Sequence, residues 1–150
     1  MDTSDTIDTL NDLIETSKDG EFGFDSCARH TRSSELRSLF AARAEACAKA
    51  ARELQGLVEQ YGGKPESSGS AAGALHRGWV AIRGSLSSHS DRSMLEECER
   101  GEDTALERYR DVLRQDLPPA VREVVERQCE GVKLNHDMIK GLRDRFDAAV

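Results

Sequence analysis

The 150-residue chain has the length of one compact domain, residues 1–150, and carries 28 acidic and 21 basic side chains, a formal net charge of −7. Because the two signs are scattered along the sequence, the concentrated basic face that nucleic acids or anionic membranes require is missing, and we expect neither partner. No apolar run approaches the roughly 20 residues that span a bilayer, and the acidic start lacks the features of a secretory signal, so we expect a cytoplasmic protein.

The first predicted helix covers about residues 4–31. Ala, Leu, Glu and Arg are abundant, and no segment alternates as a strand does. The apolar stripe of this helix continues in regular steps through Gly20 and Gly23, although each glycine costs about 1 kcal/mol relative to alanine inside a helix. We therefore expect one continuous helix, and two helices broken at Gly20 are the alternative. The stripe consists of Ile7, Leu10, Ile14, Ser17, Glu21, Phe24 and Ala28.

The second predicted helix covers about residues 34–61, and Ser33 or Ser34 can cap its start. Its apolar stripe is regular, and the middle of that stripe consists of small side chains. The stripe consists of Phe40, Ala44, Cys47, Ala51, Leu54, Val58 and Tyr61.

A glycine-rich stretch ends the second helix. Gly62 or Gly63 suits a left-handed cap, and Pro65 prevents the helix from resuming. A shorter helix is expected over about residues 71–88. We expect its Trp79, the only tryptophan of the chain, to pack this helix onto the others.

Two further long helices are predicted in the C-terminal part, over about residues 92–115 and from Pro118 or Pro119 to about residue 148. Proline is tolerated in the first turn of a helix, so the proline pair marks the start of the last one. The first of these stripes consists of Leu95, Cys98, Glu102, Ala105, Tyr109 and Val112. The second consists of Val121, Val125, Gln128, Val132, Asn135, Ile139, Leu142 and Phe146.

The lengths of the connections predict the topology. Short connections within the first and the second pair of long helices make each pair an antiparallel hairpin. The connection between the pairs is long and can run the length of the bundle. We therefore predict an all-α fold, a ferritin-like antiparallel four-helix bundle with an extra helix in the crossover.

Several polar residues interrupt the apolar stripes. Glu21 and Glu102 lie on two different hairpins, and Gln128, Asn135 and His136 lie on or beside the last stripe. Counting from the hairpin loops places these residues near the middle of their hairpins, and the two polar sets meet if the hairpins pack level with each other. A buried carboxylate costs several kcal/mol unless it is paired, protonated or metal-bound, and iron and manganese suit carboxylate and imidazole ligands. We therefore predict Glu21, Glu102 and His136 as candidate ligands of an iron or manganese ion.

A complete di-iron centre is not predicted. Such a centre needs Glu-x-x-His on two helices, but Ala48 stands at one histidine position and Lys133 at one glutamate position. Glu99, one turn from Glu102, is an alternative inward carboxylate. The competing interpretation is a hydrogen-bonded polar layer that sets the helix register. The remaining acidic residues of this segment are expected on a solvated face, namely Glu96, Glu97 and Asp103.

The four cysteines show no CxxC pattern. They lie far apart in the sequence, in segments that are predicted to be helical. We expect reduced cysteines that pack as small apolar side chains, and two disulfides are the alternative. They are Cys27, Cys47, Cys98 and Cys129.

Four blocks of the sequence carry a resemblance that covers residues 5–144. The blocks LNDLIETSKDGEFGF, GSAAGALHRGW, LEECERGEDTALERYRDVL and VVERQCEGVKLNHDMIKGLRD resemble a bacterial family of ferritin-like four-helix-bundle proteins of unknown function. This resemblance implies a ferritin-like bundle, a distant kinship to rubrerythrin-type di-iron proteins, and no established activity. Glu21, Glu102 and His136 match that superfamily in kind, whereas Ala48 and Lys133 depart from it.

No nucleophile signature, phosphate-binding loop or dinucleotide fingerprint is present. We therefore expect a non-catalytic bundle that acts by association with itself, as a homo-oligomer, or with a protein partner, for instance in a stress response. The alternative is a metal-binding or redox protein with a degenerate carboxylate and histidine site in the bundle core.

Overall fold

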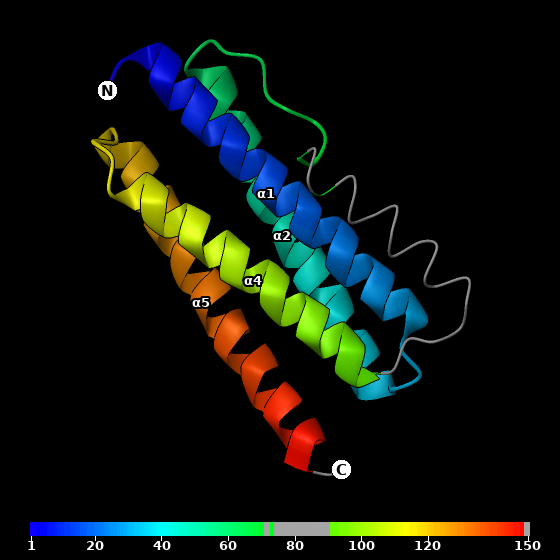
Figure 1. The fold of residues 1–150 in the computed structure, drawn as a ribbon. Coiled ribbons are helices and arrows are strands. Elements are labelled where there is room, and N and C mark those ends of the chain that lie inside the picture. Colours follow the sequence, from blue (N-terminus) through cyan, green and yellow to red (C-terminus); the bar gives the residue numbers. More distant parts are fainter. Residues whose placement is uncertain (71–72, 74–90, 149–150) are drawn as a thin grey trace.

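The computed structural model describes residues 1–70, 73 and 91–148. In these ranges the chain forms four long helices and no strand (Figure 1): α1 (Thr3–His30), α2 (Ser34–Gln60), α4 (Asp91–Leu113) and α5 (Pro119–Ala148). The predicted all-α class is confirmed, and the helix ends lie close to those expected from the sequence. The extra helix predicted over residues 71–88, with Trp79, lies outside the described residues. None of the described helices is both long enough and apolar enough to cross a membrane.

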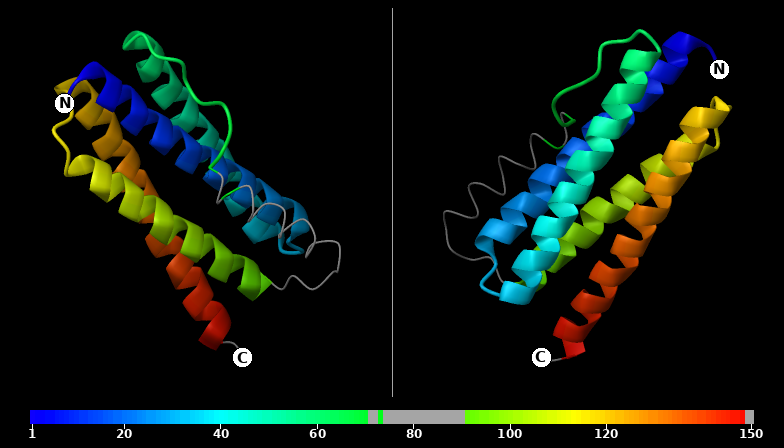
Figure 2. Two further views of the ribbon diagram at one scale, coloured as in Figure 1. Left: turned by 45° about the horizontal axis from the view of Figure 1, so that its top comes forward. Right: turned by 180° about the vertical axis from the view of Figure 1, so that it is seen from behind.

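The four helices form two antiparallel hairpins, α1–α2 and α4–α5, packed side by side (Figures 1 and 2). The end of α2 and the start of α4 lie at opposite ends of the bundle (Figure 1). As a result α4 packs against α1, whereas a simple up-and-down chain would place the third long helix beside the second. The connection between the hairpins therefore joins opposite ends of the bundle, as the predicted topology requires. The contact between α2 and α5 is much sparser than that between α1 and α4.

Helix α1 is continuous through both of its internal glycines, as the unbroken register predicts. It begins where the Asp2 side chain accepts a hydrogen bond from the Asp5 amide at 2.8 Å, which caps the helix. A Cβ placed on Gly20 would lie 2.9 Å from Cys47 Sγ, so this glycine allows α1 and α2 to approach closely. A Cβ on Gly23 would meet no described atom within 4 Å.

Local signals set both ends of α2. The Ser33 side chain accepts a hydrogen bond from the Leu36 amide at 3.2 Å, so Ser33 rather than Ser34 is the cap. At the other end Gly62 has a φ of 80°, the left-handed conformation that favours glycine. The sequence left two candidate residues for each of these positions, and the structure identifies Ser33 and Gly62.

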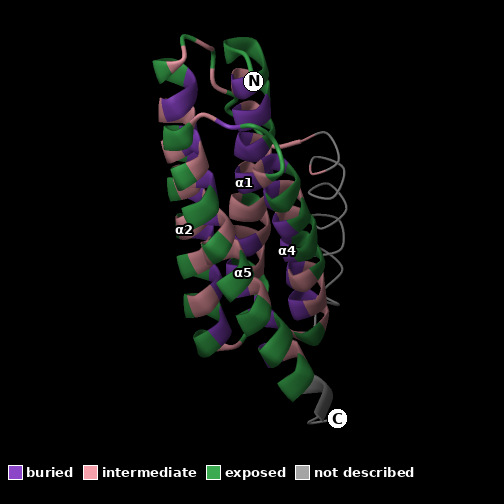
Figure 3. Cartoon of the chain, turned by 90° about the vertical axis from the view of Figure 1, so that its left-hand side faces the viewer, coloured by how far each residue is buried: buried purple, intermediate pink, exposed green. Residues whose placement is uncertain are grey.

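The bundle core consists of two apolar clusters with a polar layer between them. Buried side chains lie on the inward faces of the helices (Figure 3). One cluster includes Leu10, Ile14, Leu54, Val58, Val121 and Val125. The other includes Phe24, Phe40, Leu95 and Ile139. Of the polar residues predicted near mid-height, Ser17, Glu102, Gln128 and Asn135 are buried, whereas Glu21 and His136 are only partly buried. The Tyr109 hydroxyl, which was not predicted there, joins this polar layer.

Candidate functional site

A chain of hydrogen bonds crosses the bundle at the polar layer and links all four helices. The Tyr109 hydroxyl of α4 donates to Gln128 Oε1 of α5 at 2.8 Å. Since its only proton is used there, the Ser17 hydroxyl of α1, 3.4 Å away, donates to the Tyr109 oxygen. Gln128 Nε2 donates to Glu53 Oε1 of α2 at 2.8 Å and to the Ala50 carbonyl at 3.3 Å. Each helix therefore contributes at least one partner, which holds the four helices in one register.

The charge of this network lies at its outer end. Arg127 Nη2 donates to Glu53 Oε2 at 2.6 Å, and this hydrogen bond, helped by the one from Gln128, lowers the pKa of Glu53 against the effect of burial. At the inner end, burial raises the pKa of the Tyr109 hydroxyl. The inner hydroxyls are therefore neutral, and the ionised carboxylate is kept at the rim beside a guanidinium.

Glu102 is the one carboxylate of the layer that faces the core. It is 4% exposed, and its Oε2 has no hydrogen-bond partner among the described residues. Burial raises the pKa of Glu102, and the facing Arg43, Asn135 and His136 reduce this rise. Both polar side-chain atoms of Asn135 are buried without a well-formed hydrogen bond as well. Glu102, rather than Glu99, is thus the inward carboxylate, and the region around it is incompletely satisfied.

A cavity of about 470 Å³ adjoins the polar layer. Its volume falls in the range of small-molecule pockets, roughly 300–1,000 Å³. Small residues from all four helices line it, and their small side chains leave room for the cavity. They include Gly20, Gly23, Ala46, Ala50, Gly101, Ala105 and Gly131. Ser17, Glu102, Tyr109 and Gln128 also line the cavity, so the polar layer forms one of its walls.

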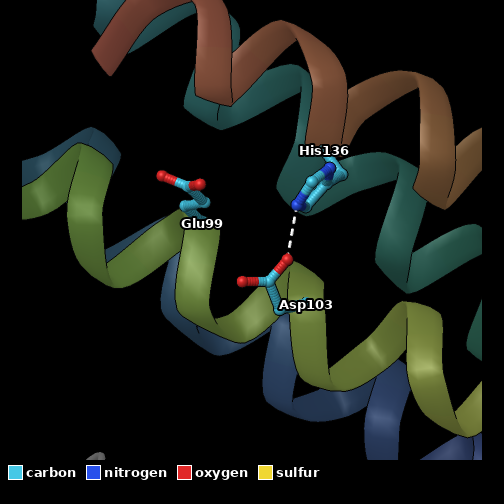
Figure 4. Close-up of side chains that lie close together, drawn as sticks. All are labelled: Glu99, Asp103 and His136. Atoms are coloured by element: carbon cyan, nitrogen blue, oxygen red, sulfur yellow. Dashed lines mark hydrogen bonds and ion pairs between the residues drawn. The ribbon is translucent and has the colours of Figure 1, made fainter. Parts of the chain in front are cut away.

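A second polar cluster lies between α4 and α5 (Figure 4). Glu99, Asp103 and His136 each offer a ligand atom, and these atoms lie within 4.8 Å of one another, the one such group found in the described ranges. Glu99 and Asp103 are four residues apart and therefore share a face of α4. His136 Nε2 lies 2.5 Å from Asp103 Oδ1, and His136 Nδ1 lies 3.2 Å from Asp137 Oδ1. The cluster thus offers two carboxylates and an imidazole from two adjacent helices.

The charges around the cluster decide how an ion would compete for it. Burial lowers the pKa of His136, but the hydrogen bonds to Asp137 and Asp103 outweigh burial, and the net shift is upward. Glu99 Oε2 forms an ion pair with Arg143 Nη1 at 2.5 Å. The side chains of Glu99 and His136 are 13% and 16% exposed, whereas Asp103 is open to solvent. An ion entering from the Asp103 side would therefore displace a proton from His136 and compete with Arg143 for Glu99.

The residues predicted from the sequence are distributed over two places. His136 belongs to the cluster between α4 and α5. Glu102 lies in the polar layer, and Glu21 is 30% exposed at its side chain and pairs with Lys18 at 3.3 Å. Burial, with lesser contributions from Glu102 and Glu21, raises the pKa of Cys47 to about 12 against the effect of Arg43, so both carboxylates lie near that thiol. Metal binding by Glu21, Glu102 and His136 together stays a prediction.

Asp103 is the member of the cluster that the sequence analysis assigned to a solvated face. Two signals were present in the sequence. Asp103 follows Glu99 by four residues, and counting outward from the loop between α4 and α5 brings Glu99 about level with His136 and Asp103 about one turn closer to the loop. The sequence does not give the rotation of α4 about its axis. That rotation determines whether Glu99 and Asp103 face His136 or the solvent.

Comparison with known proteins gives the family and the fold. A family profile described as a domain of unknown function (DUF2383) matches residues 5–115. The chain belongs to the DUF2383 family. A search of curated proteins finds no match to this DUF2383 chain. Among solved structures it is similar to a mutant of Dps1 from Mycobacterium smegmatis, with a TM-score of 0.74 and 12% identity, covering 94% of this chain and 96% of that chain. At that identity the likeness establishes the fold alone, and the predicted ferritin-like bundle is confirmed.

Proposed function

We propose that this DUF2383 protein is a non-catalytic helical bundle that binds one divalent transition-metal ion, iron or manganese, through Glu99, Asp103 and His136. The observation that carries this proposal is the spacing of the three ligand atoms, which lie within 4.8 Å of one another. Ligands about 2.1 Å from a common ion lie roughly 3–4 Å apart, so side-chain rotations are enough to close the site. Carboxylate and imidazole donors suit iron and manganese.

The expected binding is modest in affinity. The ion must compete with Arg143 for Glu99 and with a proton for His136, whose pKa is raised. Because a metal ligand must be the neutral imidazole, affinity increases as the pH rises through the pKa of His136. The ion would connect α4 and α5 near the middle of their hairpin, so binding should also raise the thermal stability of the protein.

The test is a titration of the chelator-treated, full-length protein with Mn²⁺ by calorimetry, together with Co²⁺ as a spectroscopic probe. We expect one ion per chain and at least a tenfold loss of affinity in Asp103→Asn and in His136→Gln. His30→Gln, at an exposed histidine of α1, is the matched control and should bind as the unchanged protein does. Binding by Asp103→Asn and His136→Gln that is as tight as that of the unchanged protein would refute the proposal.

The same titration distinguishes the proposed site from the ligand set predicted from the sequence. Glu21→Gln and Glu102→Gln leave the three proposed ligands intact, and we expect unchanged binding in both variants. If these two variants lose the ion while Asp103→Asn keeps it, the ion is bound in the bundle core and the proposed cluster is wrong.

An apolar pair on α5 supports a second candidate function, association with a second copy of the chain. Leu134 and Met138 are 63% and 44% exposed and lie one turn apart on the outer face of the helix. Two copies related by a two-fold axis would each present this pair and could cover both. Light scattering after size-exclusion chromatography should give a dimer that Leu134→Glu with Met138→Glu converts to a monomer. A monomeric unchanged protein at about 100 µM would refute this candidate.

A further inference from the structure

Two cysteines from different hairpins are in contact inside the bundle. Cys27 of α1 and Cys98 of α4 are 71 residues apart in the sequence, and their sulfur atoms lie 3.6 Å apart. Both are free thiols in the structure. Nothing in the proposed metal site uses either residue, so this pair requires its own explanation.

The geometry around the pair favours a bond between the two sulfurs. A disulfide joins its sulfur atoms at about 2.05 Å, so the separation must shorten by roughly 1.5 Å, a distance that side-chain rotation can supply. The two helices are already packed against each other at this level. The Thr31 hydroxyl also donates to Asp91 Oδ1 at 2.6 Å, which holds the end of α1 against the start of α4.

The two thiols differ in accessibility. Both residues line the cavity beside the polar layer, but Cys27 is half-buried, whereas Cys98 is buried. A small oxidant therefore reaches Cys27 first. Cys98 is 8% exposed and lies 3.6 Å from the Cys27 sulfur, so it is placed to react with an oxidised Cys27 rather than with the oxidant itself.

The other two cysteines have different surroundings. Cys129 packs against the opposite apolar cluster, away from this pair. Cys47 also borders the cavity, but burial raises its pKa to about 12, which makes its thiol a poor nucleophile. Both residues can therefore serve as controls.

We propose that Cys27 and Cys98 are a peroxide-oxidised dithiol that forms a disulfide between α1 and α4. The Cys27 thiolate attacks one oxygen of hydrogen peroxide, the O–O bond breaks, and hydroxide leaves, which produces a sulfenic acid on Cys27. Cys98 loses its proton and attacks the Cys27 sulfur, the S–O bond breaks, and the hydroxyl group leaves as water. In total two thiols and one peroxide give one disulfide and two waters, and the two electrons lost by sulfur reduce the peroxide.

The consequence for the protein is a covalent link between the two hairpins. Before oxidation the hairpins are joined covalently only through the connection between α2 and α4, and α2 and α5 contact each other sparsely. The disulfide closes a long loop and restricts the unfolded chain, which stabilises the folded state. A thiol reductant reverses the bond by thiol–disulfide exchange.

The first test uses the full-length, unchanged protein treated with hydrogen peroxide and then alkylated. We expect the number of alkylated cysteines to fall from the four in the sequence to two, and proteolytic mapping to find Cys27 and Cys98 in one crosslinked peptide. The melting temperature should rise by on the order of 10 °C and return to its starting value after reduction. Crosslinks to Cys47 or Cys129, chain-to-chain dimers, or four remaining thiols at a tenfold excess of peroxide would overturn the proposal.

The second test separates the two chemical steps. In Cys98→Ser the reaction should stop at the sulfenic acid, which a dimedone label detects on Cys27. Cys129→Ser is the matched control, and it should form the disulfide and show the same rise in melting temperature as the unchanged protein. Absence of the dimedone adduct on Cys27 in a Cys98→Ser protein with unchanged helical content would refute the assigned order of attack.

Discussion

Replacing Glu102 by glutamine tests how the core holds a buried carboxylate. Oε2 of Glu102 has no hydrogen-bond partner among the described residues, and both polar side-chain atoms of the facing Asn135 lack one. An amide of the same shape adds an N–H group that can donate to Asn135 Oδ1. The change also removes the interactions of Arg43, Asn135 and His136 with the charge, which reduce the rise in pKa of Glu102 that burial causes.

The expected magnitude follows from these opposing contributions. A buried polar group without a partner costs about 1–3 kcal/mol, and a new neutral hydrogen bond contributes about 1 kcal/mol. The loss of these favourable interactions with the charge offsets part of this gain. We therefore expect Glu102→Gln to raise the free energy of unfolding at pH 7 by about 1 kcal/mol, which corresponds to about 2–4 °C in melting temperature for a chain of this size.

The pH dependence of the stability tests the sign of this difference. Because the pKa of Glu102 is raised in the folded protein, the folded state takes up a proton at a higher pH than the unfolded chain does. The cost of the buried charge is therefore present above the folded pKa and disappears as the pH falls through it towards the ordinary value of 4.5. The advantage of the variant should shrink over the same range.

Urea denaturation followed by circular dichroism, at pH 7 and at pH 5, measures both effects. Glu107→Gln, at an exposed position of α4, is the matched control and should change the stability by no more than about 0.5 kcal/mol. A loss of more than 1 kcal/mol in Glu102→Gln at pH 7, or a difference from the unchanged protein that is the same at both pH values, would refute the reasoning.

Three further substitutions test the packing, the polar layer and the metal site. Gly23→Ala should raise the free energy of unfolding by about 0.5–1 kcal/mol, because the new Cβ meets nothing within 4 Å. Gly20→Ala should lower the free energy of unfolding, because its Cβ would lie 2.9 Å from Cys47 Sγ of α2. Urea denaturation compares the two variants. Tyr109→Phe should lower the free energy of unfolding by about 1–2 kcal/mol, because Gln128 Oε1 loses its hydrogen-bond donor. Tyr61→Phe is the control in the same assay. Arg143→Ala should strengthen Mn²⁺ binding about fivefold in calorimetry, because the ion no longer has to break the ion pair between Arg143 and Glu99, which is worth up to about 1 kcal/mol. Unchanged or weaker binding would contradict the competition between Arg143 and the ion for Glu99.

The residue order alone determined the helices and their inward faces. Helix ends are set by hydrogen bonds and backbone sterics that act within a few residues, so the sequence places them to within one residue without knowledge of the fold, at Ser33 or Ser34, Gly62 or Gly63, and Pro118 or Pro119. The apolar repeat likewise identifies the buried stripe, because the helical period is a property of the backbone. The polar layer was predictable for the same reason, since antiparallel helices joined by short loops allow positions to be counted outward from the loop.

The tertiary structure decided which of these polar and thiol groups come together. Successive residues of a helix differ by about 100° in direction. The rotation of α4 about its axis therefore determines that Glu102 faces the core and Asp103 faces His136. The exposure of Glu21 has a similar cause, because Gly20 is the residue that α1 presents to α2 at this level. The contact between Cys27 and Cys98 spans 71 residues and depends on the packing of one hairpin against the other, which no local pattern in the sequence encodes.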